Sequence, residues 1–199
     1  MKKRLIITES EKNEIKSLYT INEDGVMSNI IDYVRSLMTS KDNKPTTDIN
    51  ISSTDKASAK EIIDFFKNKG LTPEQSAGIA GNLWAESGFK TKALGDNSTS
   101  MGLAQWHKER KDSLIEWCKS QNLDPYSVKG QLEYLWYELN TSEKNALSKV
   151  KSSNSVEEAS FNFAKYFERC SECKNETSKT NITRMEYANK FNSEINKLA

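Results

Sequence analysis

Apolar side chains recur at helical spacing along most of the chain, and this pattern predicts a mainly α-helical protein. The clearest amphipathic segment spans residues 55–69, with inward-facing positions at Ala59, Ile62, Ile63 and Phe66. Similar stripes predict further helices over residues 108–120, 124–139, 155–167 and 180–195, and a short helix from residue 142. Residues 90–100 are rich in turn formers instead, so a loop or short hairpin is expected there.

The helix expected over residues 73–87 has the strongest start and stop signals. Thr72 is a suitable N-cap, and Gln75 three positions later completes a capping box. Proline occupies the first helical position, where its missing N–H costs little, and Gly88 is a natural C-terminal stop. The helix should therefore end just after Glu86.

Two glycines, Gly78 and Gly81, interrupt this helix. Each costs about 1 kcal/mol relative to alanine in a helix interior. The simplest reason for keeping them is the close approach of a neighbouring helix.

Glu86 lies in line with the apolar face of the same helix, because Ile79, Leu83 and Glu86 are spaced at i, i+4 and i+7. Burial beside apolar side chains would disfavour the charged form and raise the pKa of Glu86. A raised pKa is what a general acid needs near neutral pH. Asp96, in a polar loop, should stay ionised, and two carboxyl groups in opposite environments can divide acid and base roles, as in glycosidases.

Four ordered motifs together resemble the phage tail lysozyme family: Ala85-Glu-Ser-Gly-Phe89, Gly95-Asp96, Gly102-Leu-Ala-Gln-Trp-His107 and Phe167-Glu-Arg169. That family is similar in turn to goose-type lysozymes and soluble lytic transglycosylases. The resemblance covers roughly residues 55–195. It implies a lysozyme-like helical domain with a small β-region beside the cleft, action on peptidoglycan, and Glu86 as the catalytic acid. The family pattern has proline after Phe-Glu-Arg, where this chain has Cys170.

Within this resemblance Asp96 is the candidate second carboxylate. Five residues are expected to bind substrate or support the site: Ser87, Ser100, Gln105, Trp106 and His107. Gln105 would bind a sugar acetamido group or hold the acid in place. Trp106 is either a core residue or a stacking platform for sugar, and His107 forms a cleft wall or has a structural role.

Two further pairs have alternative interpretations. Tyr134 and Glu138 share a helix face that borders the cleft or meets water, and water is the favoured interpretation. Glu168 and Arg169 either support the catalytic region or form a surface ion pair that contributes little to stability. The family resemblance favours a role in supporting the catalytic region.

The charge balance narrows the classes of partner. The 199 residues include 29 basic and 28 acidic side chains, for a net charge of +1, with no basic stripe for nucleic acid. No apolar run is long enough to span a membrane, and the N-terminal residues lack the apolar stretch of a signal peptide. We expect no membrane insertion, and a location in the virion or in the host cytoplasm before release.

The chain has three cysteines, and this odd number argues against a complete disulfide framework. Cys170 and Cys173 form a C-x-x-C motif, but the only other soft metal ligands are Cys118 and His107, in distant segments. The sequence therefore predicts ordinary thiols, no metal site and no cofactor.

The N-terminal part is expected to be separate from the enzyme. Residues 1–40 contain two amphipathic stripes and form a helical extension, residues 41–54 are a polar linker, and residues 55–199 are the catalytic domain. The extension either packs on that domain or docks the protein to a virion partner.

The leading hypothesis is hydrolysis of the peptidoglycan strand between N-acetylmuramic acid and N-acetylglucosamine. One alternative is a lytic transglycosylase, which needs Glu86 alone because the muramic acid hydroxyl replaces water. Others are a glycan-binding or structural virion module without turnover, and chitin cleavage.

Overall fold

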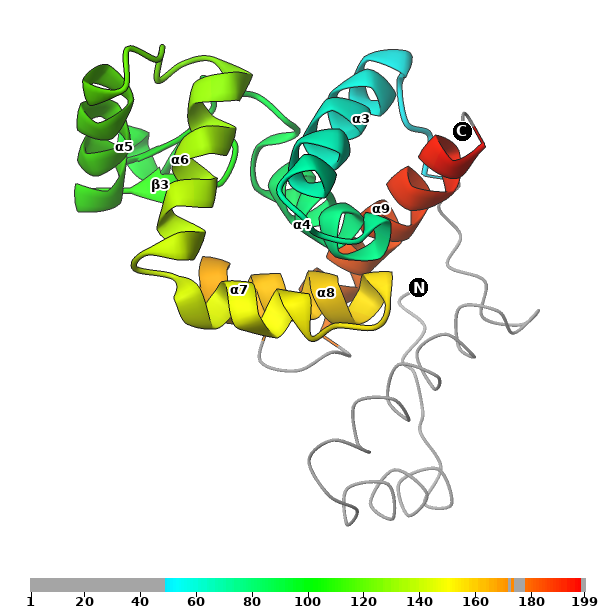
Figure 1. The fold of residues 1–199 in the computed structure, drawn as a ribbon. Coiled ribbons are helices and arrows are strands. Elements are labelled where there is room, and N and C mark those ends of the chain that lie inside the picture. Colours follow the sequence, from blue (N-terminus) through cyan, green and yellow to red (C-terminus); the bar gives the residue numbers. More distant parts are fainter. Residues whose placement is uncertain (1–48, 172, 174–177, 198–199) are drawn as a thin grey trace, which may run out of the picture. The chain divides into compact units, whose positions relative to one another are not determined.

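The protein is described here by a computed structural model that covers residues 49–171, Cys173 and residues 178–197 (Figure 1). The extension predicted for residues 1–40 lies outside the described residues. The described part is mainly helical with one small sheet, which confirms the predicted fold class. Its helices are α3 (Ser53–Asn68), α4 (Pro73–Ser87), α5 (Glu109–Ser120), α6 (Val128–Asn140), α7 (Lys144–Lys151), α8 (Val156–Phe163), the π-helical turn η2 (Ala164–Glu168) and α9 (Lys179–Asn196).

Helix α4 lies at the centre of the packing and contacts α3, α8 and α9 (Figure 1). The predicted capping box between Thr72 and Gln75 is present, and Gly88 ends the helix with φ 59°. The two mid-helix glycines face neighbouring helices, as predicted. A Cβ on Gly78 would lie 2.7 Å from that of Ala159 in α8, and one on Gly81 would lie 2.6 Å from that of Ala188 in α9.

The expected loop or hairpin is a three-stranded antiparallel sheet of β1 (Leu94–Gly95), β2 (Ser100–Met101) and β3 (Trp106–His107). A short 3₁₀ turn, η1 (Asp96–Ser98), connects β1 to β2. Ser100 pairs with His107 and Met101 pairs with Trp106. Because side chains alternate along a strand, Ser100 and His107 share one face of the sheet, and Met101 and Trp106 share the other.

One helix start differs clearly from its prediction. Helix α6 begins at Val128 and not near residue 124, because the Oγ of Ser127 accepts from Gly130 N–H and so caps the helix. The chain also joins the core before residue 55, since Ile49 and Ile51 pack against buried side chains.

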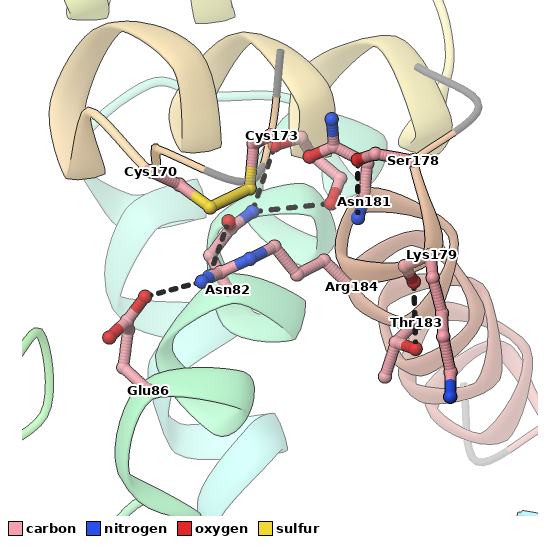
Figure 2. Close-up of a disulfide and its surroundings, with 10 residues drawn as sticks. Asn82, Glu86, Cys170, Cys173, Ser178, Lys179, Asn181, Thr183 and Arg184 are labelled. Carbon is pink, nitrogen blue, oxygen red and sulfur yellow. Dashed lines mark hydrogen bonds and ion pairs between the residues drawn. A yellow bond between two sulfur atoms is a disulfide. The ribbon is translucent and has the colours of Figure 1, made fainter. Parts of the chain in front are cut away.

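The cysteines differ from the prediction of ordinary thiols. Cys170 and Cys173 form a disulfide just before α9 (Figure 2), and Cys173 is buried. Cys118 is a free, buried thiol, and burial raises its pKa to about 11. Among the described residues no group of His, Cys, Asp and Glu is arranged to hold a metal ion. None of the described helices is long and apolar enough to cross a membrane.

Candidate active site

Glu86 lies in the last turn of α4 and binds a buried arginine. The Nη2 of Arg184, from α9, donates to Glu86 Oε1 at 2.5 Å (Figure 2). The Arg184 side chain is only 7% exposed, whereas that of Glu86 is 21% exposed. The expected apolar surroundings of Glu86 thus include the positive charge of Arg184.

Arg184 is itself held by a hydrogen-bond network that joins three helices. Its Nη1 donates to Asn82 Oδ1 at 3.0 Å, and Asn82 Nδ2 donates to the carbonyls of Gly78 and Ser160, both at 2.9 Å. Asn82 is fully buried. The position of the Glu86 partner is therefore fixed by α4, α8 and α9 together (Figure 2).

Glu168, the last residue of η2, faces this region. Its Oε1 is buried and has no hydrogen-bond partner, although part of the residue reaches the surface. Burial raises the pKa of Glu168 well above its ordinary value, and the charge of Glu86 raises it further, while Arg184 and Arg110 oppose the shift. Arg169, next in the chain, instead pairs with Glu143 at 2.8 Å. The two residues that the sequence grouped together thus belong to separate interactions.

Glu138 is the centre of a second buried group. Trp106 Nε1 donates to its Oε2 at 2.6 Å, and Arg110 donates to both carboxylate oxygens at 3.0 Å. The Arg110 guanidinium also lies over the Phe167 ring, 4.7 Å from its centroid. Tyr134 and Glu138 are both buried, so the prediction that they meet water is wrong.

Trp106 is fully buried. Of the two interpretations open for it, the structure supports the core residue, because sugar cannot stack on an indole without exposed surface. Its N–H is satisfied by Glu138, which is the usual requirement for a buried tryptophan.

Asp96 belongs to a polar group on the sheet. Ser100 Oγ donates to Asp96 Oδ2 at 2.9 Å, and Thr99 Oγ1 donates to the Asp96 carbonyl at 2.7 Å. The His107 Nδ1 lies 3.0 Å from the Ser100 hydroxyl and 3.1 Å from the Thr99 hydroxyl. If both hydroxyls donate to Asp96, the network is completed by the His107 tautomer that carries its hydrogen on Nδ1, and this tautomer has its acceptor at Nε2.

The backbone of this group is unusual. Asp96, Asn97 and Ser98 all have positive φ angles, of 47°, 54° and 70°. Such angles are uncommon for residues other than glycine, and they concentrate at functional sites. The turn displays the Asp96 side chain, which is 74% exposed.

Ser87 and Gln105 connect these parts of the molecule. Ser87 Oγ donates to the Leu103 carbonyl at 3.0 Å, which joins the end of α4 to the loop between β2 and β3. Gln105 Nε2 donates to the Gly102 carbonyl at 3.0 Å within that loop. The predicted site residues thus form two groups, one around Glu86 and one around Asp96, and Ser87 links the helix to the sheet.

Sequence reasoning missed Arg184, Asn82 and Arg110. A signal existed for Arg184, which is spaced at i, i+4 with Ala188 on the apolar stripe of α9. A charged residue at such a position needs a partner of opposite charge, and Glu86 was the other charged residue placed on an apolar face.

A helical domain with a central carboxylate-bearing helix and a small sheet is consistent with a lysozyme-like protein. The family model of the phage tail lysozymes matches residues 57–195, more than half of the chain. The chain therefore belongs to the phage tail lysozyme family, and its function is lysozyme-like action on peptidoglycan. A comparison with curated proteins found no match.

Proposed function

We propose that the protein hydrolyses the peptidoglycan glycan strand between N-acetylmuramic acid and N-acetylglucosamine, with Glu86 protonating the leaving glycosidic oxygen. The observation that carries this proposal is the placement of Glu86 at the end of α4. Arg184 fixes one of its oxygens, and 21% of its side chain stays accessible. A carboxyl group that is held but still partly exposed suits proton donation to a bound substrate.

Asp96 is the proposed second carboxylate. Its role is to orient water or to stabilise the positive charge that develops on the sugar ring. Ser100 and His107 would hold it in place, and the free Nε2 of His107 would accept a hydrogen bond from a sugar hydroxyl. Ser87 and Gln105 would position the loop between β2 and β3 along the substrate.

The decisive experiment is mass spectrometry of fragments from purified peptidoglycan digested in parallel by wild type, Glu86→Gln and Asp96→Asn. We expect reducing muramic acid ends from wild type, and a loss of at least about a hundredfold in Glu86→Gln, because general acid catalysis contributes roughly 10²–10⁴-fold. The matched control is Glu116→Gln, an exposed glutamate on α5.

Each other outcome contradicts a specific part of the proposal. Anhydro ends, one water lighter than hydrolysed ends, would indicate a lytic transglycosylase and leave Asp96 without a chemical role. Full activity of Glu86→Gln would exclude Glu86 as the acid. No fragments from folded wild type on several wall types would indicate a binding or structural virion module.

Membership of a phage tail family indicates a virion-associated protein. We propose that residues 1–40 dock the enzyme to a virion partner. Mass spectrometry of purified phage particles tests this location, since a docked enzyme copurifies with the particle and remains bound after washing in high salt.

A further inference from the structure

A hollow of about 460 Å³ lies between the small sheet, helix α5 and the segment before α6. We call it the sheet hollow, and the residues that line it are Lys92, Leu94, Met101, Lys111, Ile115 and Tyr126. The described part of the chain has three large hydrophobic side chains that are well exposed, and two of them, Leu94 at 63% and Tyr126 at 43%, lie here. Exposed apolar side chains gathered in a concave place indicate a binding surface.

The sheet hollow lies close to the Asp96 group but on the other face of the sheet. Leu94 pairs with Met101, so both side chains point away from the face that carries Ser100 and His107. Strand β1 forms an edge of the sheet, and Asp96 follows it directly. A ligand bound at Asp96 can therefore reach the hollow with a side branch that crosses the edge strand β1.

Two lysines give the sheet hollow a positive charge. No acidic residue is among those that line it, and within the described part of the chain neither Lys92 nor Lys111 forms an ion pair with a carboxylate. Lys111 Nζ donates to the Ser98 carbonyl at 3.2 Å, which holds this charge beside the turn that carries Asp96. The hollow thus suits a ligand that combines small apolar groups with carboxylates.

We propose that the sheet hollow binds the peptide branch of the peptidoglycan substrate. This branch is attached to muramic acid through its lactyl group, so it lies directly beside the glycan strand. It contains alanine and acidic residues and has free carboxyl groups. The carboxylates pair with Lys92 and Lys111, and the alanine methyl groups pack on Leu94, Met101 and Ile115. The inference rests on the proposed action at Asp96 and adds a preference for glycan that still bears its peptides.

The first test measures binding without turnover. The full chain is titrated with the disaccharide N-acetylglucosaminyl-N-acetylmuramic acid carrying its tetrapeptide, which lacks the bond that the proposed activity cleaves. NMR follows the methyl groups of Leu94, Met101 and Ile115, with those of Ile62, buried in α3, as an internal control. We expect the three hollow residues to shift with this ligand and to stay in place with the same disaccharide without its peptide.

Either of two results would overturn the proposal. Equal shifts with both disaccharides would make the hollow a sugar site, and no shift with either would leave it without a peptide ligand. The charge pairing is tested by Lys92→Glu, which should weaken binding roughly fivefold because it replaces an exposed ion pair with a repulsion of similar size. The matched control is Lys119→Glu, at an exposed position of the same helix as Lys111, and it should bind like wild type.

The second test compares kcat/KM on intact peptidoglycan with kcat/KM on glycan strands stripped of their peptides by an amidase. We expect wild type to prefer the peptide-bearing glycan. In Lys92→Glu this preference should fall roughly fivefold, through KM and not through kcat. An equal loss on both substrates would indicate a general effect of the substitution and overturn the proposal.

The results also separate this inference from the proposed function. Methyl shifts in a protein that releases no fragments would keep the peptide site and reject hydrolysis, whereas fragments without methyl shifts would reject the peptide site alone. Suppose that Lys92→Glu no longer copurifies with phage particles but binds the peptide-bearing disaccharide as wild type does. That result would assign the sheet hollow to an acidic virion partner and overturn the proposal.

Discussion

At the scale of single residues, the site depends on charged side chains that the fold has removed from water. Periodicity placed Glu86 on the inner face of its helix, yet its closest partner is Arg184, nearly one hundred residues away in the chain. Sequence spacing reports the direction in which a side chain points along its own helix. It carries no information on which residue of another helix lies opposite.

The first prediction concerns Glu168 and the pH dependence of folding. Its pKa is raised in the folded protein, so the unfolded chain loses this proton first as the pH rises. Between the unfolded pKa, about 4.3, and the folded one, stability therefore falls with pH. Glu168→Gln should abolish this fall, and be more stable than wild type at pH 8 but not at pH 4.

Urea unfolding at several pH values measures this difference. Glu116→Gln, an exposed substitution, should follow the wild-type profile throughout. Parallel profiles for wild type and Glu168→Gln would mean that Glu168 ionises as easily in the folded protein as in the unfolded chain.

At the scale of elements, the glycines of α4 are the points of closest helix contact. Alanine at Gly78 or Gly81 would gain about 1 kcal/mol of helix propensity. Its Cβ, however, would lie within 2.7 Å of backbone atoms of α8 or α9, which cannot move as a flexible side chain can. We expect each substitution to lower the free energy of unfolding by about 1–3 kcal/mol.

The control for helix propensity is Ala85→Gly, at an exposed position of the same helix. It should destabilise by about 1 kcal/mol. If Gly78→Ala and Gly81→Ala stabilise the protein in denaturant titrations, the close contacts with α8 and α9 do not control the packing of α4.

Elements with local signals were the predictable ones. The Thr72 cap, the glycine stop and the apolar stripe of residues 55–69 each act within a few positions, and the structure reproduces them. The start of α6 was harder to predict from the sequence. Asp124 and Ser127 are both good N-cap residues, and the choice between them depends on the surrounding fold. The partners of Glu138 come from β3 and α5, so no local pattern predicts its burial.

At the scale of the whole molecule, buried ion pairs connect parts of the chain that are distant in sequence. Glu138 joins α6 to β3 and α5 through Trp106 and Arg110. Glu138→Gln would take the buried counter-charge away from the Arg110 guanidinium, which is itself 30% exposed, and we expect a loss of about 1–3 kcal/mol in the free energy of unfolding.

The matched control is Glu133→Gln, on the same helix. Glu133 pairs with Lys69 at 2.9 Å, but both side chains are about 30% exposed, so its loss should cost less than about 1 kcal/mol. Equal losses for the two variants in urea unfolding would show that burial does not distinguish these pairs.

The π-helical turn η2 has a consequence for how this arrangement is encoded. Its hydrogen bond runs from Arg169 N–H to the Ala164 carbonyl, five residues back, so the turn contains one residue more than an α-helical turn. That residue rotates Glu168 by about 100° relative to an unbroken α-helix. A change that let these residues close as an ordinary α-helical turn, with none of them lost, would point Glu168 elsewhere while every residue of the Glu86 and Asp96 groups remained. The direction of Glu168 therefore depends on the hydrogen-bond register of this turn as well as on the residue type at position 168.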